Sequence, residues 1–128
     1  MPRPPSEMLT EREARIMDVL WRHSAATADE VRAELPGEPH DSTVRTLLRV
    51  LEGKGFVVHE RRGKTFVYRA AAARDKVQRQ ALRSFLARLF GGSAEDLVLR
   101  LLEDEQITPD QLAQLRRAEP KRTRRKKR

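Results

Sequence analysis

Apolar residues recur at helical spacing along the N-terminal half of the chain, and each recurrence follows a cap or turn signal. Thr10 and Glu13 have the spacing of a capping box, as do Thr27 and Glu30, so a helix is expected to begin at each pair. Pro36-Gly37 ends the second helix. The predicted inward positions of the first helix are Ala14, Met17, Leu20 and Trp21.

A third helix and a hairpin are expected next. The helix is predicted to run from a cap at Asp41 or Ser42 to about Glu52, with inward positions Val44, Leu47, Leu48 and Leu51. Segments 56–60 and 65–69 are β-rich, and the connection Arg61-Arg62-Gly63-Lys64 predicts a hairpin with a cationic tip. Three helices followed by a hairpin are typical of a winged helix-turn-helix, although the turn before Asp41 exceeds the usual minimal length.

The C-terminal half is predicted to be helical. Segment 75–90 carries a long apolar stripe, Gly91-Gly92 terminates it, and further helices are expected to begin near Ser93 and Thr108. The fold class is therefore mainly α with a small β hairpin. We expect a winged helix-turn-helix DNA-binding domain over 8–70, a three-helix dimerisation domain over 74–118 and a disordered basic tail over 119–128.

The distribution of charge indicates an anionic partner. The formal net charge is +8, and seven of the residues 121–128 are Lys or Arg, so the rest of the chain is almost neutral. Residues 42–69 are locally basic, with seven Lys or Arg against two Glu. The helix face and the hairpin tip in this segment supply the candidate DNA-binding residues, which are Ser42, Thr43, Arg45, Thr46, Arg49, Arg61, Arg62 and Lys64. The alternative is that these side chains form merely solvated surfaces.

The apolar stripes of the C-terminal helices suggest a homodimer. Three short helices can hardly cover stripes this apolar among themselves, so a second copy is the natural cover, although folding back onto the N-terminal domain remains an alternative. A dimer would place two third helices on a roughly palindromic operator in double-stranded DNA. The candidate dimerisation residues are Leu82, Phe85, Leu86, Leu89, Leu97 and Leu101.

Over roughly residues 8–117 the chain resembles the penicillinase-repressor (BlaI/MecI) group of winged-helix regulators. The resemblance is carried by Leu9-Thr10-Glu11-Arg12-Glu13, Ile16-Met17-Asp18-Val19-Leu20-Trp21, the run from Ser42 to Gly55, and Gly63-Lys64-Thr65-Phe66-Val67-Tyr68. It implies a homodimeric repressor with a C-terminal helical dimerisation domain, released by an inducing signal that can act through a protease.

The cleavage position is also an implication of the resemblance. The family's Asn-Phe cleavage bond aligns with Arg100-Leu101, where this sequence differs at both positions. The resemblance also implies derepression by an antibiotic-responsive membrane sensor-protease that detects β-lactams. Because the bond differs here, we expect repression to end through loss of the dimer, with a protease or signal that differs from the β-lactam case.

Other classes of protein receive little support from the sequence. His23, His40 and His59 lie in separate elements, and no nucleophile elbow or Gly-rich phosphate loop is present, so we expect no enzyme, cofactor or metal site. The absence of cysteine excludes disulfides and thiolate metal sites. A cytoplasmic protein without a membrane segment is expected. Two rival functions remain: a winged-helix regulator that binds an effector directly, and a non-regulatory architectural or RNA-binding protein.

Overall fold

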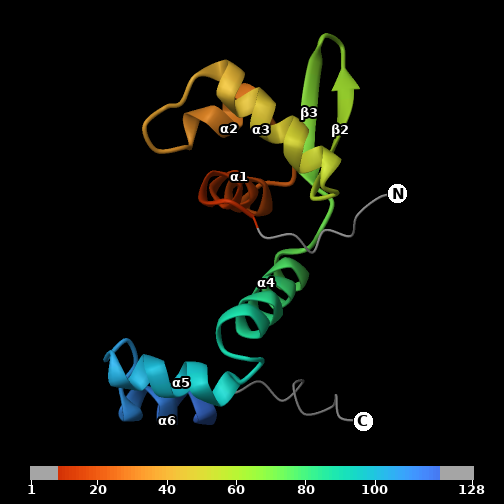
Figure 1. Ribbon diagram of the computed structural model, residues 1–128. Coiled ribbons are helices and arrows are strands. Elements are labelled where there is room, and N and C mark those ends of the chain that lie inside the picture. Colours follow the sequence, from red (N-terminus) through yellow and green to blue (C-terminus); the bar gives the residue numbers. More distant parts are fainter. Residues whose placement is uncertain (1–8, 119–128) are drawn as a thin grey trace. The chain divides into compact units, whose positions relative to one another are not determined.

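The computed structural model describes residues 9–118 and has the predicted fold class (Figure 1). The start of the predicted first domain at residue 8 and the predicted tail 119–128 lie outside the described residues. The elements, in chain order, are α1 (Glu11–Arg22), β1 (Ala26–Thr27), α2 (Ala28–Ala33), α3 (Asp41–Gly53), β2 (Val57–Arg62), β3 (Thr65–Ala70), α4 (Arg74–Leu89), α5 (Ala94–Glu103) and α6 (Pro109–Arg117).

The chain divides into two compact units between Ser84 and Phe85, within α4. The first part of α4 belongs to the N-terminal unit because Val77 is buried in the same apolar core as α1 and α3. This division concerns compactness alone. The assignment of residues 8–70 to DNA binding and of residues 74–118 to dimerisation remains a prediction. Within residues 9–118 no helix combines the length and the apolar character needed to cross a bilayer.

Both predicted capping boxes of the N-terminal half are present. The Thr10 hydroxyl accepts from the Glu13 amide at 3.1 Å, and the Glu13 carboxylate accepts from the Thr10 amide at 2.9 Å. Thr27 and Glu30 make the same exchange at the start of α2. The predicted cap of α3 is wrong: His40 is the N-cap and gives no side-chain bond.

The sheet contains one strand more than the predicted hairpin. Strands β2 and β3 pair antiparallel around the turn at Gly63, whose φ of 63° is a conformation that glycine adopts without steric cost. Strand β1 pairs with the other edge of β3, with Ala26 opposite Tyr68. Two residues show no strand periodicity of their own, so the sequence pattern did not reveal β1.

The core of the N-terminal unit shows that the predicted inward face of α1 is partly wrong. Ala14 is exposed, whereas Ile16, Met17, Val19 and Leu20 are buried together with Val44, Leu48 and Leu51 of α3. Glu13 is 3% exposed, and its carboxylate lies 3.0 and 3.1 Å from Nζ of Lys54, the residue that caps the C-terminal end of α3. This ion pair joins the start of α1 to the end of α3.

The C-terminal unit has well-defined helix starts and exposed apolar side chains. Ser93 caps α5, and Thr108 and Gln111 form a capping box at α6. Neither helix contains a buried residue. Leu89, Leu99 and Leu115 are 64, 54 and 58% exposed, so the described part of this unit leaves much apolar surface uncovered.

Candidate nucleic-acid interface

Helix α3 separates its buried and outward residues cleanly. Val44, Leu48 and Leu51 are fully buried against α1, α2 and β2, so the opposite face of α3 points away from the core. Ser42, Thr46 and Arg49 lie on that outward face and are exposed. Thr43 is half-buried on one flank, and Arg45 is exposed on the other. The five candidate residues of α3 therefore lie on the outward half of one helix.

Arg45 is held in place by its own helix. Its Nε donates to Oδ2 of Asp41 at 2.8 Å, one helical turn earlier, and this hydrogen bond and the carboxylate charge raise the pKa of Arg45 above its ordinary value. The Asp41 carboxylate that was predicted to cap the helix thus orients Arg45 instead. Arg45, Lys64 and Phe66 line a hollow of about 420 Å³ beside the start of α2.

Arg49 differs from Arg45 because it forms no ion pair among residues 9–118. It lies one turn after Arg45 and contributes positive charge near the hydroxyl of Tyr68. Burial, followed by the charge of Glu52, raises the pKa of Tyr68, and Arg45 and Arg49 oppose this shift. A guanidinium with no intramolecular acceptor keeps its donors available for a base edge or a phosphate.

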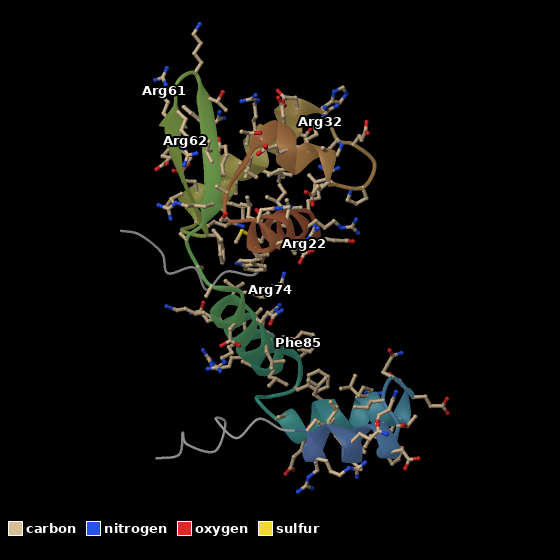
Figure 2. The ribbon with its side chains drawn as sticks, turned by 180° about the vertical axis from the view of Figure 1, so that it is seen from behind. Arg22, Arg32, Arg61, Arg62, Arg74 and Phe85 are labelled. Carbon is tan, nitrogen blue, oxygen red and sulfur yellow. The ribbon has the colours of Figure 1, made fainter. Side chains whose placement is uncertain are left out.

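The hairpin β2–β3 presents the remaining candidate cations (Figure 2). Arg61 donates to the carbonyl of Gly63 at 3.2 Å, which orients its guanidinium at the turn. Arg62 pairs with Glu60 at 3.1 Å, and both side chains are more than half exposed, so water and salt weaken this pair. Lys64 is exposed at the tip. The predicted cationic tip is present, with Arg62 partly neutralised.

An unpredicted contact joins the hairpin to α3. Nδ1 of His59 lies 2.8 and 2.9 Å from the carboxylate oxygens of Glu52 near the end of α3. The His59 ring stacks on Phe66, with centroids 4.4 Å apart, and also contacts Tyr68 at 5.5 Å. A turn separates Glu52 from His59 in the sequence, and the hairpin turn separates His59 from Phe66. Helical or strand spacing therefore could not predict these contacts. It fixes the base of the hairpin relative to the helix.

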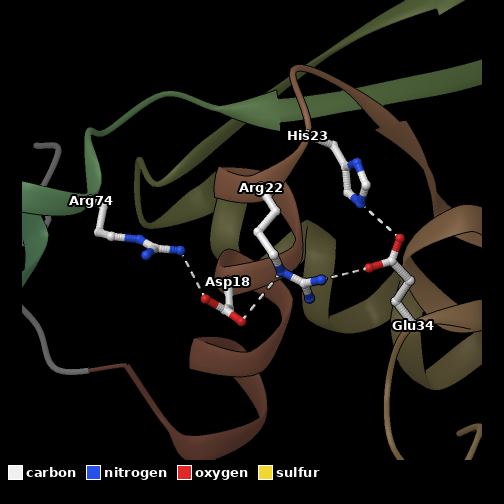
Figure 3. Close-up of polar contacts among 5 residues, drawn as sticks. All are labelled: Asp18, Arg22, His23, Glu34 and Arg74. Carbon is white, nitrogen blue, oxygen red and sulfur yellow. Dashed lines mark hydrogen bonds and ion pairs between the residues drawn. The ribbon is translucent and has the colours of Figure 1, made fainter.

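A second polar network joins α1 to its neighbours (Figure 3). Asp18 accepts from Arg74 at the start of α4 at 2.9 Å and lies 3.6 Å from Arg22. Arg22 and His23 both reach the carboxylate of Glu34, at 3.0 and 2.7 Å. These contacts position the end of α2 and the start of α4 on α1, and they lie apart from the exposed candidate residues of α3.

A comparison with models of known protein families identifies the family of this chain. The model of the penicillinase repressor family matches residues 9–118. The chain belongs to the penicillinase repressor family. It is 30% identical over 109 residues to the penicillinase repressor of Bacillus licheniformis, covering 84% of this chain and 85% of that one. It is 26% identical over 110 residues to the methicillin resistance regulatory protein MecI of Staphylococcus aureus (strain N315), covering 84% and 89%.

A solved structure agrees with the N-terminal fold. The solution structure of the DNA-binding domain of the repressor BlaI superposes with a TM-score of 0.51 at 30% identity, over 58% of this chain and 90% of that domain. Family membership confirms the predicted resemblance, the winged-helix fold and the prediction of a DNA-binding repressor rather than an enzyme. The individual site residues stay predictions in this member of the penicillinase repressor family.

The candidate dimerisation and cleavage residues occupy the helices after the sheet. Leu82 and Leu89 of α4 are exposed, whereas Phe85, Leu86, Leu97 and Leu101 are half-buried. Within the C-terminal unit the rings of Phe85 and Phe90 lie 5.6 Å apart. The Arg100-Leu101 bond lies in the last turn of α5, where the Arg100 carbonyl accepts from the Asp104 amide at 2.9 Å.

Proposed function

We propose that this penicillinase repressor homologue represses transcription by inserting α3 into the major groove of an operator. The observation that carries the proposal is the outward face of α3, a helix anchored by three buried residues. On this face Arg49, which forms no ion pair within residues 9–118, lies with Ser42 and Thr46. In such docking the third helix reads base edges and the hairpin follows the backbone. Arg61, Arg62 and Lys64 then supply phosphate contacts, which add affinity without sequence preference.

The operator-binding form in this proposal is a homodimer. Leu82 and Leu89 of α4 expose 49 and 64% of their surface, and the C-terminal unit leaves further leucines uncovered. Apolar side chains in such numbers favour a two-fold partner that removes them from water. A two-fold protein binds two half-sites related by the same symmetry, so we expect a roughly palindromic operator, bound in the cytoplasm.

The experiment that tests this function is a comparison of Arg49→Ala with Arg83→Ala, an equal loss of charge on exposed α4. The operator is first selected from a random pool of duplexes. In a gel-shift titration at near-physiological salt, Arg49→Ala should weaken specific binding by about 1 to 3 kcal/mol, while Arg83→Ala changes it little. Equal binding by Arg49→Ala and the parent protein would mean that another element reads the operator.

The same selection separates this function from its rivals. An architectural or RNA-binding protein would enrich no duplex sequence, or would prefer RNA, whereas a repressor enriches one operator by several powers of ten over other DNA. A regulator that binds its effector directly would enrich an operator too. That alternative predicts a rise in melting temperature when the effector is added to the purified protein.

For the end of repression we propose loss of the dimer, with cleavage between Arg100 and Leu101 as the candidate step. The bond lies in a hydrogen-bonded helical turn, so a protease needs local opening of α5 before it can cut. Because both residues differ from the Asn-Phe pair, we expect the signal to differ from the β-lactam signal. Cells exposed to a β-lactam should keep the full-length protein on an immunoblot, and a fragment ending near Arg100 would contradict this divergence.

A further inference from the structure

The outward half of α3 carries one apolar side chain that the core does not use. Val50 is 40% exposed, although its helix neighbours Leu48 and Leu51 are fully buried. Valine is also a poorer helix former than alanine or a long polar residue, so local helix stability gives no reason for it at a solvated position. This valine is therefore available for contact with a ligand on the face that the proposed function turns toward DNA.

Two threonines extend the apolar character of Val50 along α3. Thr43, Thr46 and Val50 are spaced by three and four residues, which places them along one side of the helix. We name this set of three methyl-bearing side chains the methyl edge. Thr43 is half-buried and Thr46 is exposed.

The opposite side of α3 has a different chemistry. There Asp41 pairs with Arg45, and Glu52 holds His59 of the hairpin. The charged groups of α3 are thus gathered toward the hairpin, and the methyl groups lie along the other side. In the major groove of DNA, the charged side of such a helix would contact polar groups and its methyl-bearing side would contact apolar groups.

Thymine is the base that offers an apolar surface in the major groove. Its C5-methyl group projects there and is the largest apolar group on a base edge, whereas most of the distinguishing groups of the other bases are hydrogen-bond donors or acceptors. Val50 has no polar side-chain atom, so it can bind neither a phosphate nor a donor or acceptor. We infer that the methyl edge, with Val50 as its principal contact, reads the C5-methyl of a thymine in each operator half-site.

This inference rests on the proposed function and assigns a base chemistry to it. Burying one methyl group is worth about 0.8 kcal/mol, which corresponds to a factor of about 4 in affinity. Removing the methyl from one half-site should therefore weaken binding roughly fourfold, and removing it from both half-sites about sixteenfold.

The test uses deoxyuridine, which pairs as thymine does but lacks the C5-methyl. Each thymine of the selected operator is replaced in turn, and the affinity of the parent protein is measured for each duplex. We expect one thymine in each half-site at which the replacement costs about fourfold. Because Val50→Ala changes both protomers, it should bind the unmodified operator about as weakly as the parent binds a duplex with deoxyuridine in both half-sites, and it should lose the discrimination at both positions.

Arg49→Ala is the matched control, one residue away on the same helix. It should lose affinity for both duplexes and keep the ratio between them. Val50→Thr, which retains one methyl group, should show intermediate discrimination. Melting temperatures equal to that of the parent would establish that the variants are folded.

The outcomes separate this inference from the function on which it rests. Operator selectivity with no thymine sensitive to deoxyuridine, or with the same sensitivity in Val50→Ala, would overturn the inference and leave the repressor function intact. If the parent protein selects no operator at all, the function itself fails.

Discussion

The ion pair between Glu13 and Lys54 offers a sharp test of how α3 is held. Glu13 is almost fully buried, and its carboxylate receives Lys54 Nζ at 3.0 Å as well as the Thr10 amide. Replacing Lys54 by Met keeps most of the aliphatic stem and removes the ammonium group. The carboxylate then stays buried, and among the described residues the Thr10 amide is the partner that it retains.

The expected loss of unfolding free energy is about 3 kcal/mol. Breaking a buried pair by removing one partner costs roughly 3 to 5 kcal/mol, because a buried charge is left without compensation. The lower end applies here, since the Lys54 side chain is 24% exposed and the Thr10 bond remains. For a unit of this size such a loss lowers the melting temperature by on the order of 15 °C.

Urea unfolding followed by Trp21 fluorescence measures this loss, and Trp21 is the only tryptophan of the chain. Lys76→Met, the same change at an exposed position of α4, should stay within about 0.5 kcal/mol of the parent. Adding Glu13→Gln to Lys54→Met should recover part of the loss, because glutamine keeps an acceptor for Thr10 without the charge. A Lys54→Met variant as stable as Lys76→Met would refute this account of the pair.

Two further predictions address the dimer and the single tyrosine. The double substitution Leu86→Asp with Leu101→Asp should give monomers by analytical ultracentrifugation and weaken operator binding by at least tenfold, because the second half-site is no longer tethered; a parent protein that sediments as a monomer at micromolar concentration would contradict it. Absorbance titration of Tyr68 should give a midpoint above the ordinary value of 10, because burial disfavours the phenolate. By linkage, the stability that Tyr68 contributes is fully present below pH 10 and is lost as the pH rises through the pKa of the folded state. A free energy of unfolding that does not decrease as the pH rises above 10 would contradict this prediction.

The sequence predicted those features that depend on neighbouring residues. The capping boxes at Thr10 and Thr27 each need two side chains three residues apart, and the glycine turn of the hairpin needs one residue that tolerates positive φ. The buried face of α3 follows from helical spacing alone. Such signals lie within a few residues of one another, so they can be identified without knowledge of the tertiary fold.

Features that join distant segments were missed. The Glu13 to Lys54 pair spans 41 positions, and the short strand β1 exists because β3 offers it an edge. Ala14 was assigned to the core because it lies on the same helical side as Met17, but Ile16 and Val19 occupy the interior instead. The sequence of α1 contains this information, because Ile16, Met17, Val19 and Leu20 recur at helical spacing, and giving the larger apolar residues precedence over Ala14 would have identified the buried side.

The structure separates the residues that position α3 from those that would read DNA. Lys54 and Glu52 tie the end of α3 to α1 and to the hairpin, while Arg49 and Val50 point outward with no part in the core. Substitutions of Arg49 or Val50 should therefore lower operator affinity at unchanged stability. Lys54→Met should instead lower the stability and leave operator affinity unchanged when that affinity is calculated for the folded fraction of the protein. A loss of affinity in folded Lys54→Met would mean that the ion pair also sets the orientation of α3 in the groove.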